Sequence, residues 1–193
     1  MIIAYKASPP ENCGHMWADP KTRGNPPPGV VCPACDQRID YAAINPNYKP
    51  PRSYYDLCAT YDGDFLVSAR LHDYLGQRNL AGVAFAALPS SQRYFVLQCT
   101  NLLKLVPPPT FRMEEYCEAC RQYKSVYGIN LISDSVRIYF DNINSSIREG
   151  IYLSDLKMGY GPSKGPLLFV GVGTWQGMVN EKFRGIYGRP IVN

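Results

Sequence analysis

Histidine is scarce in this sequence, and long apolar runs are missing. Only two histidines occur among the 193 residues, His15 and His72, and neither has an obvious partner for acid–base or nucleophilic chemistry. No segment approaches the roughly 18 consecutive apolar residues of a membrane-spanning helix. Residues 1–6 lack the basic and the long apolar parts of a secretory signal peptide. These absences argue against a membrane-associated protein and predict a cytoplasmic one.

Cysteine is present in an odd number. The seven cysteines do not suit a secreted framework of disulfides, which favours an even count. For a cytoplasmic protein, the count predicts reduced thiols. Cys58 lies in a loop-rich stretch, and we expect it to be a small buried apolar side chain.

Motifs of several common enzyme classes are also missing. The sequence has no G-x-S-x-G, no H-E-x-x-H, and no H-x-E ahead of a C-x-x-C, the pattern of zinc deaminases. The glycine-rich stretch 159–166 lacks the Gly-Lys-Ser/Thr of a phosphate-binding loop. A cysteine–histidine nucleophile pair stays open, drawn from Cys13, Cys58, His15 and His72. We expect a protein that is not an enzyme.

Two C-x-x-C motifs are the most informative feature that the sequence does contain. The first is Cys32-Pro33-Ala34-Cys35 and the second is Cys117-Glu118-Ala119-Cys120. Two thiols at this spacing can grip one face of a tetrahedral ion, and a second pair can close the other face. The pattern predicts one structural Zn²⁺ site with four ligands, Cys32, Cys35, Cys117 and Cys120.

The distance between the two motifs leaves other interpretations open. A compact zinc ribbon separates its pairs by roughly 15–20 residues, whereas 81 residues lie between Cys35 and Cys117. The metal would therefore join the two ends of a folded body. The alternatives are two unrelated turns with free thiols and a redox-active C-x-x-C. Cys13 or His15 would be the substitute ligand if one of the four cysteines is not used.

The net charge does not favour a nucleic-acid partner. The formal charge of +4 counts every cysteine as neutral. Four thiolates around one Zn²⁺ would reduce it to +2, which is close to neutral for a chain of this size. Nucleic-acid binding usually needs a strong basic stripe, so we expect no such partner and no membrane partner.

Hydrophobic patterning predicts several strands and few helices. Residues 2–7 form a short first strand. Ser68 is a candidate N-cap for a helix that runs to about Gln77. Residues 82–88 and 94–99 form an antiparallel hairpin, and the second of these strands extends towards residue 106.

The second half of the chain adds more short elements. Strands are expected at residues 129–132, 136–140 and 167–170. Short helices are expected at residues 151–157 and 175–183. Together these elements predict a single α+β domain, 1–193, with an antiparallel sheet, a few short helices and a structural zinc knuckle with four cysteine ligands. The knuckle is built from residues 28–38 and 114–124, and the body from residues 62–106 and 129–193.

The cysteine motifs and their context resemble a known family. The segments that show the resemblance are Pro28-Gly-Val-Val-Cys-Pro-Ala-Cys35, Phe65-Leu-Val-Ser-Ala-Arg-Leu71, Leu80-Ala-Gly-Val-Ala-Phe85 and Cys117-Glu-Ala-Cys120. They are similar to the double C-x-x-C family of bacterial immunity proteins, which accompany polymorphic or contact-delivered toxins. The resemblance covers residues 28–125. The sequence departs from the family pattern at Asp36 and Arg121, where a glycine commonly follows each motif.

The resemblance implies a cytoplasmic, non-enzymatic protein that binds and neutralises a cognate protein toxin. Tight protein inhibitors present aromatic or arginine anchors inside a polar rim. Tyrosine-rich stretches at residues 41–61 and 116–127 are candidates, with the anchors Tyr48, Tyr54, Tyr55 and Tyr123. The alternatives are a zinc-dependent nucleic-acid-binding module and a structural or assembly subunit.

Overall fold

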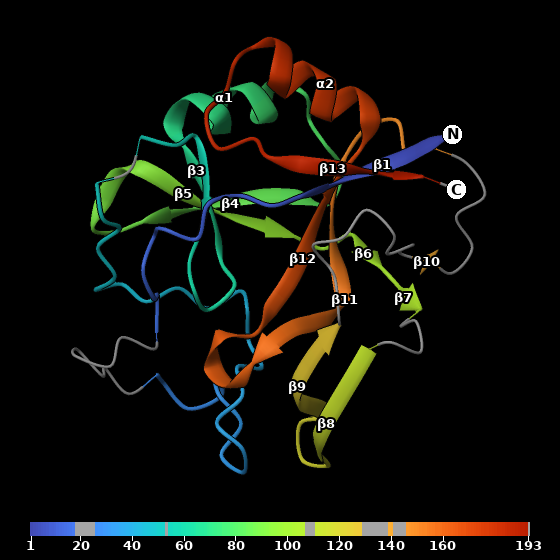
Figure 1. Cartoon of the computed structure of the whole chain (residues 1–193). Helices are drawn as coiled ribbons and strands as arrows, with labels where there is room; N and C mark the ends of the chain where they lie inside the picture. Colours follow the sequence, from blue (N-terminus) through green and yellow to red (C-terminus); the bar gives the residue numbers. More distant parts are fainter. Residues whose placement is uncertain (18–25, 53, 107–110, 129–138, 141–145, 193) are drawn as a thin grey trace.

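The chain is an α+β protein in which strands dominate. The computed structural model describes residues 1–17, 26–52, 54–106, 111–128, 139–140 and 146–192. Most strand pairs are antiparallel, and two short α-helices lie side by side at one end of the molecule (Figure 1). No helix in these described ranges is both long and apolar enough to cross a membrane.

The larger sheet contains seven strands from both ends of the chain. In spatial order its main path is β13 (Gly188–Val192), β1 (Ile2–Ala7), β12 (Gly165–Val170), β11 (Ile151–Tyr160), β9 (Gln122–Gly128) and β8 (Phe111–Cys117). The short strand β6 (Leu102–Leu103) pairs in parallel with β11. A separate pair joins β7 (Leu105–Val106) to β10 (Tyr139–Phe140). The first predicted strand is confirmed with its bounds.

The smaller sheet has four strands from the middle of the chain. Its order is β2 (Leu57–Ala59), β3 (Phe65–Ser68), β5 (Ser91–Cys99) and β4 (Val83–Leu88). The predicted hairpin of β4 and β5 is confirmed, but β5 ends at Cys99. The prediction that it extends towards residue 106 is wrong, because β6 and β7 follow as separate short strands with other partners. The strand predicted at residues 129–132 lies outside the described residues, as does the first part of the strand predicted at 136–140. The last two residues of that second strand form β10.

Helix α1 (Ala69–Gln77) begins where the sequence predicts. The Ser68 side chain accepts a hydrogen bond from the Leu71 N–H (3.2 Å) and donates one to Asp56 Oδ1 (2.7 Å). A serine at this position satisfies one of the free N–H groups of the first helical turn. Helix α2 (Val172–Asn180) overlaps the helix predicted at residues 175–183, and a 3-10 turn, η1, spans Gly161–Ser163.

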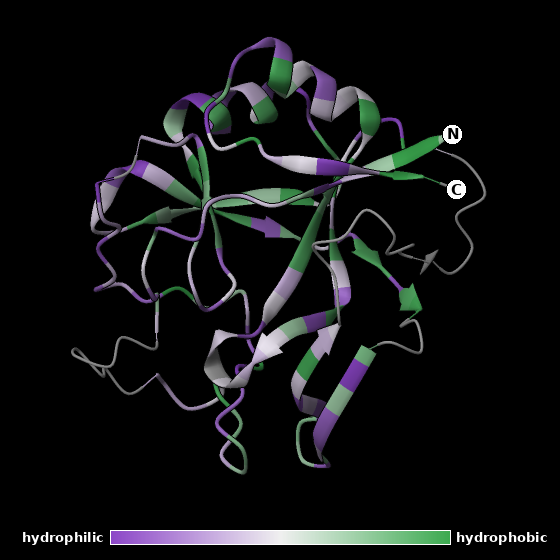
Figure 2. Cartoon of the chain, in the orientation of Figure 1, coloured by the Kyte–Doolittle hydropathy of each residue, from purple (hydrophilic) through white to green (hydrophobic). Residues whose placement is uncertain are grey.

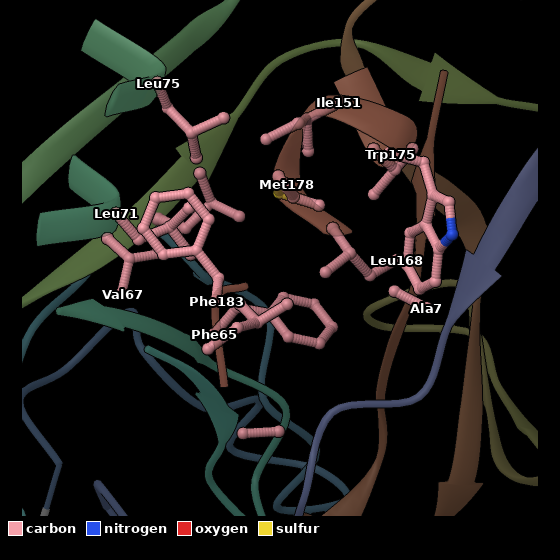
Figure 3. Packing of buried hydrophobic residues seen from close by; sticks show 14 residues of the cluster. Ala7, Phe65, Val67, Leu71, Leu75, Ile151, Leu168, Trp175, Met178 and Phe183 are labelled. Carbon is pink, nitrogen blue, oxygen red and sulfur yellow. The ribbon is translucent and has the colours of Figure 1, made fainter. Parts of the chain in front are cut away.

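The main core lies between the two helices and the two sheets. Alternation along β3 sends Phe65 and Val67 into this core and Leu66 to the opposite face, as expected for a strand buried on both sides. Leu71 from α1 and Met178 from α2 meet these side chains (Figure 3). Figure 2 shows green, hydrophobic segments in both helices and in several strands of the two sheets. The core therefore joins residues from both halves of the chain.

A second core covers the other face of the smaller sheet and contains a disulfide. Cys13 and Cys58 are fully buried and bonded to each other across a sequence separation of 45. Cys58 is buried in an apolar cluster as predicted, but it is bonded to Cys13, so the prediction that all thiols are reduced is wrong. The fold brings these two cysteines together because the loop carrying Met16 packs over Leu66 and Val96.

Strand β11 replaces the short helix predicted at residues 151–157. It pairs with β12 through a register shift between Leu153 and Lys157. At this irregularity Ser154 Oγ accepts a hydrogen bond from the Leu167 N–H (2.8 Å), and Asp155 Oδ1 accepts one from the Leu105 N–H (2.9 Å). The side chains of these two residues bind the backbone of neighbouring strands, and the helix predicted here is wrong.

Breaking the disulfide should destabilise the fold strongly. The chain-entropy relation gives about 4 kcal/mol for a closed loop of this length. The double variant Cys13→Ala/Cys58→Ala should therefore lower the free energy of unfolding measured with urea by roughly that amount. Cys99→Ala serves as the single-cysteine control. Unfolding midpoints of the native protein that are identical with and without a reductant would contradict the prediction.

Candidate metal centre

The four cysteines of the two C-x-x-C motifs converge on one point. Their sulfur atoms all lie within 4.8 Å of one another, close enough to bind a metal ion. Cys32 Sγ is 3.9 Å from Cys117 Sγ, and Cys35 Sγ is 3.6 Å from Cys120 Sγ. Four sulfurs placed about 2.3 Å from a central ion in a regular tetrahedron are about 3.8 Å apart. These two distances are close to that value, so the cluster is compact enough for tetrahedral thiolate coordination.

The first pair lies in a short turn that closes on itself. The Asp36 N–H donates to the Cys32 carbonyl (2.8 Å), and the Cys32 N–H donates to the Gln37 carbonyl (2.8 Å). Val31 forms an isolated bridge with Arg38 on either side of this turn. The chain therefore reverses directly after Cys35 and holds both thiols on one side.

The second pair lies in the turn of the β8–β9 hairpin and repeats this geometry. The Arg121 N–H donates to the Cys117 carbonyl (2.7 Å), and Cys117 faces Gln122 in the strand ladder. Asp36 and Arg121 both have φ of 57°. Both residues therefore stand where the backbone is left-handed, a conformation that favours glycine.

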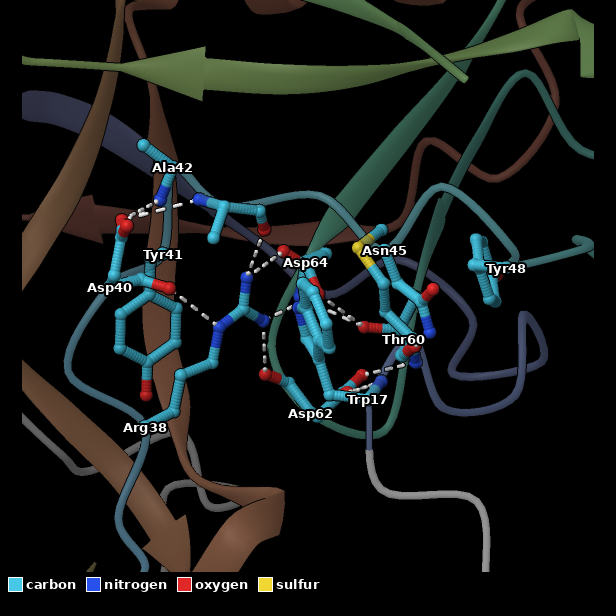
Figure 4. Close-up of polar contacts among 12 residues, drawn as sticks. Trp17, Arg38, Asp40, Tyr41, Ala42, Asn45, Tyr48, Thr60, Asp62 and Asp64 are labelled. Atoms are coloured by element: carbon cyan, nitrogen blue, oxygen red, sulfur yellow. Dashed lines mark hydrogen bonds and ion pairs between the residues drawn. The ribbon is translucent and has the colours of Figure 1, made fainter. Parts of the chain in front are cut away.

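A buried ion pair fixes the first turn to the body of the protein. Arg38 donates from Nη1 to Asp64 Oδ2 (2.6 Å) and from Nη2 to Asp64 Oδ1 (2.8 Å), and both residues are almost fully buried (Figure 4). Burial raises the pKa of Asp64 to about 6, and the Arg38 guanidinium offsets part of that shift. The Asp64 carboxylate is mainly ionised at neutral pH, so two charge-assisted hydrogen bonds connect it to the Arg38 guanidinium.

The neighbouring carboxylate of Asp62 connects this ion pair to the N-terminal loop. Its two oxygens accept hydrogen bonds from the N–H groups of Met16 (2.9 Å) and Trp17 (2.7 Å). The Asp62 carbonyl accepts a further bond from Arg38 Nη1 (3.3 Å). One buried polar network therefore positions the loop containing the disulfide and the loop containing Cys32 and Cys35.

Lys164 joins the second turn to the body. It is 2% exposed, and its ammonium group donates a hydrogen bond to the Tyr123 carbonyl on β9. Its own carbonyl accepts a hydrogen bond from the Tyr41 hydroxyl (2.6 Å). Burial lowers the pKa of Lys164, whereas the nearby thiols of Cys120 and Cys35, when ionised, act in the opposite direction. A buried cation thus lies close to a potentially anionic cluster.

The four thiols do not ionise equally readily. Hydrogen bonds from the backbone of Cys120, and a further one from the Cys35 side chain, lower the pKa of Cys117 to about 7. Burial raises the pKa of Cys35 to about 12. Since a cysteine binds metal as its thiolate, these shifts favour Cys117 over Cys35 as the thiolate.

The other candidate ligands and nucleophiles lie apart from this cluster. Cys13 is in the disulfide, and the ring of His15 packs 4.9 Å from that of Tyr61. His72 stacks on Phe95 with 4.1 Å between ring centres. Neither Cys13 nor His15 belongs to the group that could hold a metal.

The proposed tyrosine anchors divide into buried and exposed residues. Tyr48 is 6% exposed and donates its hydroxyl to the Cys13 carbonyl, so its prediction as a surface anchor is wrong. Tyr123 is partly buried and packs edge-on against Tyr116. Tyr54 is 83% exposed, and Tyr55 is partly buried beside it.

Sequence reasoning missed the buried residues that support the centre. In the sequence, nothing distinguishes Arg38, Asp62 and Asp64 from ordinary charged residues of loops. Lys164 is only one residue of a glycine-rich turn. The sequence signals were weak: Arg38 follows the first motif closely, Asp62 and Asp64 flank Gly63, and Lys164 lies between two glycines. Comparison with models of known protein families, with curated protein sequences and with solved structures found no match.

Glycine at the left-handed position of the second turn should stabilise the protein. A side chain in this conformation costs about 1–2 kcal/mol, and the greater freedom of glycine in the unfolded chain offsets part of that gain. We expect Arg121→Gly to raise the free energy of unfolding by up to about 1 kcal/mol. Asp36→Gly should gain less, because aspartate tolerates this conformation better.

The matched control for these variants is Arg112→Gly. Arg112 is an exposed arginine in β8, the strand that leads into the same turn. Glycine at position 112 should lower the free energy of unfolding. The backbone there is extended, so the left-handed conformations that glycine can adopt bring no benefit. If Arg121→Gly lowered the free energy of unfolding as much as Arg112→Gly, the strain ascribed to the left-handed backbone at Arg121 would be contradicted.

Proposed function

We propose that the four cysteines hold one structural Zn²⁺ and that the protein is a non-enzymatic immunity protein that binds and neutralises a cognate toxin. The observation that carries the proposal is the convergence of two remote C-x-x-C pairs on one point with tetrahedral spacing. The toxin as partner comes from the resemblance of these motifs and their context to immunity proteins.

Zinc suits the chemistry of the four ligands. Thiolates favour soft or borderline metals, and a tetrahedral site of four sulfurs is typical of zinc or iron–sulfur centres. Single Zn²⁺ ions with four cysteine ligands are closed, so that no position remains for water or substrate. Such an ion would tie the turn after Val31 to the β8–β9 hairpin and would supply no catalytic group.

The charge around the cluster supports an ion of this kind. Four thiolates and one divalent cation carry a net charge of −2. The buried ammonium group of Lys164 lies close enough for the ionised thiols of Cys35 and Cys120 to influence it. Lys124 on β9 pairs first with Glu115 (2.7 Å), and the ionised thiols of Cys35 and Cys117 interact with it more weakly. These cations offset part of the negative charge of a filled site.

Metal analysis tests the first half of the proposal. The purified protein should contain one zinc ion per chain, and Co²⁺ in its place should give the absorption bands of a tetrahedral thiolate complex. The double variant Cys117→Ser/Cys120→Ser should lose the ion and unfold more easily. Cys99→Ser removes a thiol outside the cluster and should keep the ion.

Two results would contradict the metal assignment. One is a purified protein without stoichiometric metal whose stability a strong chelator does not change. The other is equal loss of zinc in Cys99→Ser and in the double variant. Iron in place of zinc, with the absorption of an iron–sulfur centre, would overturn the identity of the ion.

Co-expression tests the second half. Products of the genes next to the gene for this chain are expressed one at a time in a bacterial host, with and without this protein. We expect one product to arrest growth and this protein to restore it. The variant Cys117→Ser/Cys120→Ser should restore growth less well, because the loop and the hairpin lose their common tie. Neighbouring products that are harmless, or toxic regardless of this protein, would overturn the toxin as partner.

A further inference from the structure

A pocket lined by arginine and tyrosine side chains opens between two segments that are remote in sequence. It has a volume of about 520 Å³, and its lining includes Arg52, Tyr54, Tyr55, Arg184 and Tyr187. Tyr54 is 83% exposed and Tyr187 is 55% exposed. The rings of Tyr55 and Tyr187 meet edge-to-face with 6.4 Å between their centres. Each wall therefore contributes an arginine and at least one aromatic ring.

The two walls are locked together by their backbones. The N–H groups of Asp56 and Leu57 both donate to the Arg184 carbonyl, at 2.8 and 3.2 Å. The Arg184 N–H donates in return to Asp56 Oδ2 (2.8 Å). Gly185 has φ of +85°, and a Cβ there would lie 2.1 Å from the Leu57 carbonyl oxygen. The pocket is therefore formed in advance, which reduces the entropic cost of binding a partner.

The charge of the pocket is positive and unpaired. Arg52 and Arg184 are exposed, and neither guanidinium has a hydrogen-bond or ion-pair partner within the described part of the chain. The carboxylate of Asp56 beneath them is already engaged. It accepts bonds from Ser68 Oγ and the Arg184 N–H and lies 3.8 Å from Arg70 Nη1. Two positive charges therefore remain available beside exposed tyrosine rings.

We propose that this pocket is the docking site for a partner protein and that it binds an acidic segment of that partner. Aspartate or glutamate carboxylates of the segment pair with Arg52 and Arg184, and its apolar groups pack on Tyr54 and Tyr187. Arginine and tyrosine are the residue types that dominate binding energy at protein interfaces. A compact pocket with two arginines suits an acidic peptide better than a nucleic acid, whose extended backbone usually needs a long basic stripe. The inference rests on the proposed function of binding a protein toxin.

Binding of a labelled hexaglutamate peptide, followed by fluorescence anisotropy, tests the proposal. The double variant Arg52→Gln/Arg184→Gln should bind the peptide about tenfold more weakly or worse, because it loses two charge-assisted contacts. The control Arg93→Gln/Arg148→Gln removes the same charge from exposed positions outside the pocket and should bind as the native protein does. Both variants should keep their metal content and thermal stability, because the backbone bonds of Arg184 do not use its side chain.

Three results would overturn the docking site. One is equal affinity of the two double variants for the peptide. A second is no measurable binding of the peptide by the native protein. The third is an oligothymidylate of equal net charge that competes more strongly than hexaglutamate itself, which would point to nucleic acid as the ligand.

The co-expression assay separates failure of this inference from failure of the proposed function. If native protein neutralises a toxin and Arg52→Gln/Arg184→Gln does so equally well, the docking site is wrong and the immunity function stands. If no neighbouring product is neutralised while the peptide still distinguishes the two double variants, the pocket stands and the toxin partner is wrong.

Discussion

Four sulfur atoms from turns 85 residues apart along the chain meet within 4.8 Å, and this convergence constrains one whole end of the molecule. The segment that carries Cys32 and Cys35 has only isolated β-bridges of its own. The β8–β9 hairpin carries Cys117 and Cys120 at the edge of the larger sheet, and its outer strand is almost entirely exposed. Each element has its own contacts with the body, so the meeting of the four sulfurs adds a second constraint on where the two turns lie.

Polar contacts with the body bring the two turns to this meeting point. The pair of Arg38 and Asp64 holds one turn, and Lys164 holds the strand that follows the other. Buried ion pairs add little net stability compared with apolar packing, but removing one partner is costly because the other charge stays buried. Their effect here is positional: they allow few alternative placements of the cysteine turns.

The arginine–tyrosine pocket depends on a different part of the fold. Its walls are the segment leading into β2 and the segment joining α2 to β13, which lies near the helices, whereas the β8–β9 hairpin lies towards the other end (Figure 1). The backbone bonds between Asp56, Leu57 and Arg184 shape the pocket without any help from the cysteine cluster. Loss of metal and loss of docking charge should therefore have separable effects.

The local features of this protein could be predicted from its sequence. The spacing of Cys32 with Cys35 and of Cys117 with Cys120 indicates metal ligands, because the chemistry of paired thiols is contained within four residues. Ser68 marks the start of α1, and the polar turn after Leu88 marks the β4–β5 hairpin, because caps and turns are set by neighbouring residues. The strand at residues 2–7 could also be predicted, because its limits are set by neighbouring residues.

Only the tertiary structure decided which remote residues meet. It paired Cys13 with Cys58, Arg38 with Asp64, and the backbone of Arg184 with that of Asp56. It also made residues 151–160 a strand, because β12, β9 and β6 pair with this segment. A sequence determines the chemistry that each segment offers, but a long-range contact depends on how buried surfaces from distant segments fit together, and no local pattern records that fit.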